Sequence, residues 1–153
     1  MSNIEIEKLI LSTIAISGIL IAFKFKGVFH KAISIGLTVC ILLVWINSKC
    51  ILTNSFIIFG ILTITTVIYG LIVKEINLFE KISIIIMGLF LTNSFIFTLF
   101  HLPFAGQIKL SMIIPISLAL ITFIKGRKLT KEMSFMLFWL FYATLELLKI
   151  WIY

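Results

Sequence analysis

Aspartate does not occur in this sequence of 153 residues, and charged residues of both signs make up only 12% of it. All six acidic residues are therefore glutamates, and only Glu146 lies within a long apolar run. An intramembrane hydrolase or a proton relay of two carboxylates needs more acidic groups than this. The shortage argues against an enzyme, and we expect the protein to have no catalytic activity.

Cysteine and histidine are also scarce, with two of each. Cys40 lies within one apolar run and Cys50 at the edge of the next, a spacing that fits neither a disulfide framework nor a metal site. His30 and His101 are a membrane thickness apart in the topology derived below, so one haem or metal ion cannot bridge them. We therefore expect no metal and no cofactor.

Apolar residues, in contrast, make up 61% of the chain and give it a mean hydropathy of +1.25. Water is a poor solvent for such a chain, and a bilayer core of about 30 Å needs about 20 helical residues to cross it. Continuous apolar runs favour helices, because barrel strands alternate between apolar and polar residues. The sequence predicts an all-α, polytopic membrane bundle with six transmembrane helices at about 8–25, 31–47, 51–73, 82–101, 109–125 and 133–152.

The loops between these runs are short, which makes consecutive helices antiparallel neighbours. We expect three helical hairpins in a single transmembrane domain, residues 1–153. The basic residues divide unevenly between the two sides of this arrangement. On one side lie nine: Lys24, Lys26, Lys31, Lys74, Lys81, Lys125, Arg127, Lys128 and Lys131. On the other side lie four: Lys8, Lys49, Lys109 and Lys149.

This bias predicts the orientation, because loops rich in lysine and arginine stay in the cytoplasm. It indicates a multi-pass protein of a bacterial cytoplasmic (inner) membrane with both termini outside. The net charge of +7 is explained by these loops better than by nucleic acid, which we do not expect as a partner. The basic loop 125–131 is also suited to attract anionic lipid.

Glu146 and Lys149 lie one helical turn apart, so they can pair on one face of the last predicted helix. In one interpretation Lys149 reaches the outer interface and neutralises the carboxylate. In the other, Glu146 faces the bundle and carries a proton or binds a cation, with His101 near the same leaflet. Glu146, His101 and Lys149 are therefore the candidate ion or proton pathway.

Three further residues stand out within the apolar runs. Asn54 and Asn93, each in a copy of the hexapeptide LTNSFI, are expected to form interhelical polar contacts, because an amide in hydrocarbon seeks a hydrogen bond. Pro115 removes one helix hydrogen bond and is expected to kink the fifth span, where Ser111 and Ser117 could satisfy the freed carbonyl. Glycines that permit close helix contact occur at Gly18, Gly36, Gly60, Gly70 and Gly88.

The stretch TLFHLPFAGQIKL, residues 98–110, is a turn between two apolar runs, because Pro103 disfavours helix and Gly106 relaxes the backbone. Together with its flanks, residues 82–125, it resembles the two-helix membrane hairpin of the stator subunit of the gliding-motility and protein-secretion motor. The residues that carry the resemblance are Phe97, His101, Pro103 and Ala105.

The turn of that family reads Phe-Lys-x-x-His-Trp-Pro-Gly-Ala and faces outward. Here Thr98, Leu102 and Phe104 stand in place of the lysine, the tryptophan and the glycine. The acidic residue of the family, eleven positions after the alanine, corresponds to Ile116. The resemblance therefore implies a membrane hairpin and does not extend to a proton-driven stator mechanism.

We expect a small non-enzymatic integral membrane protein that acts as an accessory or structural subunit of a membrane complex. The expected partners are the lipid bilayer and either another membrane protein or further copies of the chain. The alternative is a small transporter or channel in which Glu146, His101 and the Pro115 kink form the pathway.

Overall fold

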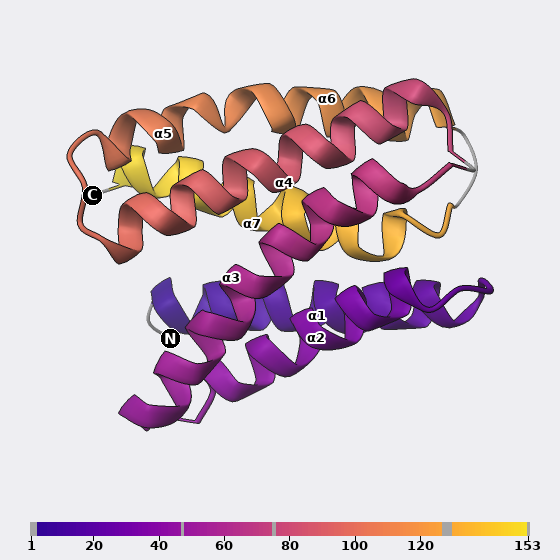
Figure 1. Cartoon of the computed structure of the whole chain (residues 1–153). Coiled ribbons are helices and arrows are strands. Elements are labelled where there is room, and N and C mark those ends of the chain that lie inside the picture. The colour runs from indigo at the N-terminus through magenta and orange to yellow at the C-terminus, as the bar shows by residue number, and fades with distance from the viewer. Residues whose placement is uncertain (1–2, 47, 75, 127–129, 153) are drawn as a thin grey trace. The chain divides into compact units, whose positions relative to one another are not determined.

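The computed structural model describes residues 3–46, 48–74, 76–126 and 130–152. Within these ranges every regular element is an α-helix (Figure 1), which confirms the helical prediction. The helices are α1 (Asn3–Phe23), α2 (Phe29–Val44), α3 (Lys49–Ile72), α4 (Leu78–Leu99), α5 (Ala105–Ser111), α6 (Ile113–Gly126) and α7 (Met133–Ile152).

Most of the predicted spans correspond to segments long and apolar enough to cross a membrane. In the described ranges there are five: Ile4–Phe23, Lys49–Ile72, Leu78–Leu99, Gly106–Gly126 and Met133–Ile150. The predicted span 31–47 corresponds to α2, which has only 16 residues. At 1.5 Å per residue α2 is about 24 Å long, shorter than a hydrocarbon core of about 30 Å. A sixth crossing by α2 therefore stays a prediction.

The chain divides into two compact units. The first comprises residues 1–62 and 129–138, and the second comprises residues 63–128 and 139–153. Helices α3 and α7 each contribute a part to both units, because the division falls within them.

Hydroxyl groups link the helices of the first unit. Thr38 Oγ1 of α2 lies 3.1 Å from the carbonyl oxygen of Ala15 in α1. Ser55 Oγ of α3 donates to the carbonyl oxygen of Cys40 in α2 at 2.9 Å. Both hydroxyls are buried, where polar groups need protein partners in place of water. The Thr38 hydroxyl also lies 2.9 Å from the carbonyl oxygen of Ser34 in its own helix.

In the second unit, α4 begins at an N-cap and α7 is joined to α3 by a buried hydrogen bond. Asn77 Oδ1 accepts from the backbone N–H of Phe79 at 3.0 Å, and Glu80 lies in the first turn, where an acidic side chain favours the helix dipole. Trp139 Nε1 donates to Thr66 Oγ1 at 3.1 Å, and both side chains are buried. A buried indole N–H normally needs such a partner.

Other hydroxyls bond to the carbonyl four residues earlier in their own helix, which satisfies them without another helix. Such pairs include Thr13 with Leu9, Ser17 with Thr13, Thr53 with Lys49, Thr92 with Gly88, Ser117 with Ile113 and Thr144 with Leu140. The exposed serines and threonines of this set are therefore compatible with an apolar surrounding.

The predicted span 109–125 is interrupted. Its helical part begins earlier, at Ala105, and α5 and α6 meet at Met112. Pro115 lies in the first turn of α6, a position that suits proline because the N–H groups there have no partner within the helix. The interruption therefore lies three residues before the proline.

Pro115 leaves the carbonyl oxygen of Ser111 without its helical N–H partner. The side chains of Ser111 and Ser117 were expected to satisfy this oxygen, but they bond to other carbonyls. Ser111 Oγ donates to the carbonyl oxygen of Ile108, and Ser117 Oγ donates to that of Ile113, each at 2.7 Å. They stabilise the end of α5 and the start of α6 respectively.

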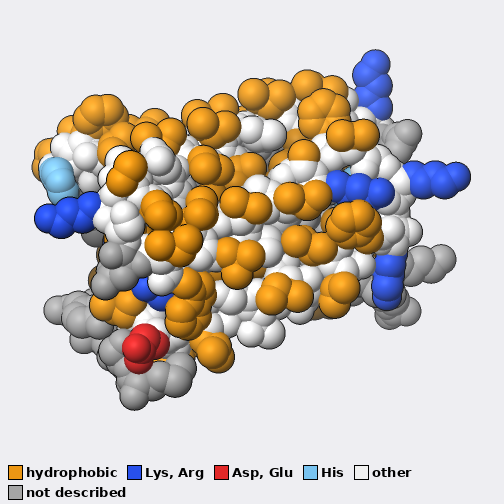
Figure 2. All heavy atoms as spheres, turned by 90° about the horizontal axis from the view of Figure 1, so that it is seen from below, with side chains coloured by type: hydrophobic (Ala, Val, Ile, Leu, Met, Phe, Trp, Pro, Cys, Tyr) orange, Lys and Arg blue, Asp and Glu red, His pale blue; other side chains and the backbone are white. Residues whose placement is uncertain are grey.

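Large apolar side chains are exposed on every long helix, among them Leu20, Ile61 and Ile124. On the face drawn in Figure 2, hydrophobic side chains predominate. Lysines lie near helix ends within each unit, such as Lys31 in the first turn of α2 and Lys125 in the last turn of α6. Soluble monomers rarely expose so much contiguous apolar surface. This distribution suits helices that lie in hydrocarbon and carry their charges at the level of the lipid headgroups.

Candidate functional site

Glu146 is the centre of a cluster of three charged side chains in the second unit. It lies on α7 and is only 7% exposed. Lys149 Nζ lies 2.8 Å from Oε1, and Lys109 Nζ lies 2.8 Å from Oε2. The structure thus pairs Glu146 with Lys149, as their spacing suggests, and adds Lys109, which the sequence analysis did not connect with it.

The two lysines reach the carboxylate from different helices. Lys149 follows Glu146 by one turn of α7, so the two side chains project from the same face. Lys109 lies in the last turn of the seven-residue helix α5, where a cation also favours the helix dipole. The Lys109 and Lys149 side chains are 25% and 35% exposed, so each keeps contact with the surface while its ammonium group binds the buried carboxylate.

The cluster has a formal charge of +1, because one carboxylate faces two ammonium groups. Each carboxylate oxygen of Glu146 accepts a charge-assisted hydrogen bond, which is roughly twice as strong as a neutral one. A cation could bind Glu146 only by displacing at least one lysine. The geometry therefore suits an ion-pair anchor between α5 and α7 better than a cation site.

His101 follows the last residue of α4 by two positions and is exposed. Its φ is 49°, in the left-handed region, and its N–H donates to the carbonyl oxygen of Thr98 at 3.4 Å. The N–H of Leu102 donates to the carbonyl oxygen of Phe97 at 3.0 Å. These two bonds form a Schellman C-cap with His101 at the left-handed position. Among the described contacts none joins His101 to Glu146, so the structure does not bring these two candidates together.

Asn54 and Asn93 are both exposed. Asn54 Nδ2 lies 4.0 Å from Cys50 Sγ, one turn earlier in α3. In the part of the chain that the structure describes, neither amide bonds to another helix. Instead, contacts between helices are made by hydroxyl and indole groups, among them those of Thr38, Ser55 and Trp139.

The first unit buries two titratable side chains, those of His30 and Glu132. His30 is 2% exposed, and its Nε2 lies 3.2 Å from the carbonyl oxygen of Ala22. Glu132, just before α7, is also 2% exposed, and its carboxylate lies 4.0 Å from Lys131 Nζ. Glu132 falls in a polar loop of the sequence, outside the predicted spans, so no pattern marked it as buried.

Lysine contacts pair helix ends within each unit. Lys8 Nζ, near the start of α1, donates to the carbonyl oxygen of Val44 at 3.0 Å and lies 5.9 Å from the centre of the Trp45 ring, at the end of α2. Lys125 Nζ, at the end of α6, lies 5.1 Å from the centre of the Phe79 ring, at the start of α4. In each pair the start of one helix meets the end of the other, as expected if α1 and α2, and likewise α4 and α6, are antiparallel neighbours. Two cations of the basic loop, at positions 127 and 128, lie outside the described residues.

Neither the described side chains nor the comparisons with known proteins point to a particular chemistry. No group of three or more His, Cys, Asp or Glu residues that could hold a metal ion occurs within the described ranges. The chain was compared with models of protein families, with curated proteins and with solved structures, and none of these comparisons gave a match.

Proposed function

We propose that this chain is a small, non-enzymatic, multi-pass protein of a bacterial cytoplasmic (inner) membrane and acts as an accessory or structural subunit of a larger membrane complex. Its five long apolar helices support a place in the membrane. Short connections leave it little polar surface outside the bilayer. A partner would therefore bind mainly through the helix faces.

The observation that carries this proposal is the environment of Asn93. Its exposed amide lies on a face of α4 that is otherwise apolar, with Leu89 one turn before it and Ile96 one turn after it, 46% and 37% exposed. The exposed hydroxyls described above bond within their own helices, but Asn93 makes no such bond among the described contacts. An amide in this position gains a hydrogen bond worth about 0.6–2 kcal/mol when another helix covers it.

Replacing Asn93 with leucine is expected to weaken association with the partner about 3- to 30-fold, the factor that corresponds to one interhelical hydrogen bond. The measurement is native co-purification in mild detergent, with mass spectrometry to identify and quantify the associated proteins. Ser117→Ala is the matched control, because the exposed Ser117 hydroxyl is satisfied by Ile113 of its own helix. A natural chain that purifies as a stable, lone monomer would contradict the proposal, and recovery of the chain alone as an oligomer would identify self-association instead.

We propose the orientation that the lysine bias predicts, with both termini outside. Reporter fusions are expected to place the turn at Ser48 outside the cytoplasm and the chain after Gly126 inside it. The measurement is the activity of a periplasm-specific phosphatase and of a cytoplasm-specific fluorescent protein at each position. The same compartment for both positions would contradict this arrangement.

Transport through the bundle is the alternative proposal, and the geometry supports it less. It depends on Glu146 and His101 acting together, but the lysines occupy both oxygens of Glu146 and His101 serves as a helix cap. We also keep the stator-like hairpin as a proposal about architecture, since its motif coincides with the capped turn between α4 and α5.

A further inference from the structure

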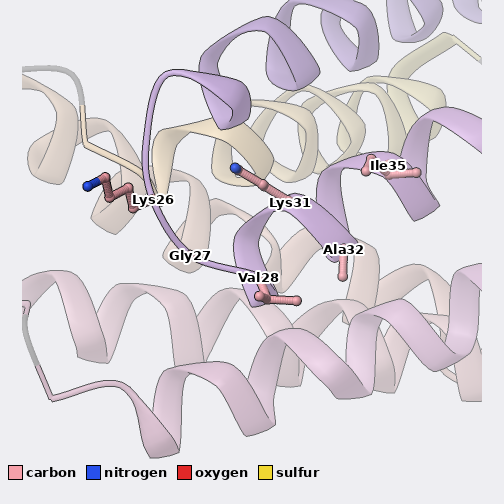
Figure 3. Close-up of a pocket in the computed structure, with 6 residues that line it drawn as sticks. All are labelled: Lys26, Gly27, Val28, Lys31, Ala32 and Ile35. Atoms are coloured by element: carbon pink, nitrogen blue, oxygen red, sulfur yellow. The ribbon is translucent and has the colours of Figure 1, made fainter.

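A hollow of about 430 Å³ lies on the first unit, where the turn after α1 leads into α2 (Figure 3). Two of its residues carry ammonium groups, none is acidic, and the others are apolar or glycine. The lining residues are Lys26, Gly27, Val28, Lys31, Ala32 and Ile35. We propose that this hollow binds an anionic phospholipid, whose headgroup phosphate is held by the two lysines and one of whose acyl chains lies along α2.

The backbone of the turn that follows Lys26 packs against a buried histidine ring. Gly27 has a φ of +137°, and a Cβ added there would lie 2.8 Å from His30 Cε1. The buried ring of His30 is in turn bonded to Ala22 of α1. A larger residue does not fit at Gly27, and the backbone between Lys26 and Lys31 is packed directly on the imidazole.

The Lys31 ammonium group is placed by an aromatic ring rather than by a carboxylate. Its Nζ lies 5.4 Å from the centre of the ring of Phe23, the last residue of α1. A cation–π contact orients the ammonium group without cancelling its charge. Lys31 therefore remains attractive to a phosphate, to which a lysine binds as a point charge.

An exposed apolar row continues from the hollow along α2. Val28, Ala32, Ile35, Val39 and Leu42 follow one another at intervals of four and three residues, which places them on one face. Val28, Ile35, Val39 and Leu42 are 80%, 41%, 44% and 52% exposed. A ligand that fits both the lysines and this row is charged at one end and apolar at the other, which describes a phospholipid better than a soluble phosphate.

The shortness of α2 brings the lysines to the level of the headgroups. A helix of 16 residues falls short of the hydrocarbon thickness, and one response to such a mismatch is local thinning of the bilayer. Thinning draws phosphates toward the end of α2 at which Lys26 and Lys31 lie. The lysine bias of the sequence predicts that this end faces the cytoplasmic leaflet, whose surface is negatively charged.

The test is a lipid titration of the purified full-length protein in neutral detergent, read by native mass spectrometry. Phosphatidylglycerol is expected to bind more tightly than phosphatidylcholine of the same chain length. Lys26→Gln and Lys31→Gln are each expected to weaken phosphatidylglycerol binding about fivefold, and the double variant about 30-fold. Ala32→Trp, which keeps both lysines and fills the hollow, is expected to weaken binding as well.

The charge-matched control is Lys24→Gln combined with Lys74→Gln. Lys24 belongs to the same turn as Lys26 but does not line the hollow, and Lys74 belongs to the second unit. This control is expected to change phosphatidylglycerol binding less than twofold. Equal binding of the two lipids, or equal losses in the control and the Lys26/Lys31 double variant, would overturn the proposal. Displacement of the lipid by millimolar glycerol phosphate would assign the hollow to a soluble phosphate instead. Unchanged helical circular dichroism of each variant ensures that a loss reflects binding.

Discussion

Replacing Gly18 with alanine is expected to lower the free energy of unfolding by about 3 kcal/mol, the upper end of the usual cost of overpacking. Gly18 of α1 packs directly on the carbonyl oxygen of Ser134 at the start of α7, where an added Cβ would overlap that atom. The obstacle is backbone, which cannot rotate away as the end of a side chain can. The measurement is equilibrium unfolding in mixed micelles, followed by helical circular dichroism.

Gly126→Ala is the matched control for this variant. It makes the same chemical change at the last residue of α6, where an added Cβ meets no atom within 4 Å. Alanine there is expected to be neutral or to stabilise the helix by up to about 1 kcal/mol, since glycine is the weaker helix former. Equal effects of the two variants would show that the contact between Gly18 and Ser134 does not hold the first unit together.

The long apolar runs of the sequence were a good guide to the helices. A run of about 20 apolar residues that crosses a bilayer has to satisfy its own backbone by forming a helix, because hydrocarbon offers no partner to a peptide group. The predicted spans 51–73 and 133–152 accordingly agree with α3 and α7 to within two residues at each end. The break of the fifth span at Met112 was harder to place, because a proline identifies a disturbed helix without specifying where the chain interrupts it.

The contacts between helices were less predictable. An amide has more hydrogen-bonding groups than a hydroxyl, which made Asn54 and Asn93 the natural candidates for interhelical bonds. The structure uses smaller groups such as Thr38 and Ser55, which allow the backbones to come closer. Which face of a helix meets its neighbour depends on packing over the whole unit, and hydropathy alone carries little of that information in a chain that is apolar on all sides.

The charged cluster around Glu146 contains one contact that the sequence predicted and one that it did not. Pairing of Glu146 with Lys149 follows from helix geometry alone, because residues three apart on a helix are neighbours. Lys109 is distant in sequence and belongs to a short helix that the prediction merged with the fifth span. Only the fold brings its ammonium group to Glu146. This second lysine changes the expected chemistry, since it occupies the oxygen that a proton or cation would otherwise use.

Replacing Glu146 with glutamine is expected to lower the free energy of unfolding by about 3 kcal/mol, the lower end of the range for a buried ion pair that loses one partner. The variant leaves the Lys109 and Lys149 ammonium groups facing each other without the carboxylate between them. The lower end applies because both lysines are partly exposed and can move toward the surface. The measurement is the same equilibrium unfolding in mixed micelles.

The Lys109→Met variant distinguishes an ion-pair anchor from a transport site. It leaves Glu146 paired with Lys149, and the remaining pair has no net charge. It is expected to cost about 1 kcal/mol, less than half of the Glu146→Gln loss. Methionine at all three positions is expected to recover most of the stability, since apolar replacement of a whole ion cluster is often neutral or stabilising. A transport role predicts a different pattern, in which Glu146→Gln abolishes flux in reconstituted vesicles and leaves unfolding almost unchanged. That pattern would refute the anchor, because an ion pair that holds α5 to α7 cannot lose its only carboxylate without loss of stability.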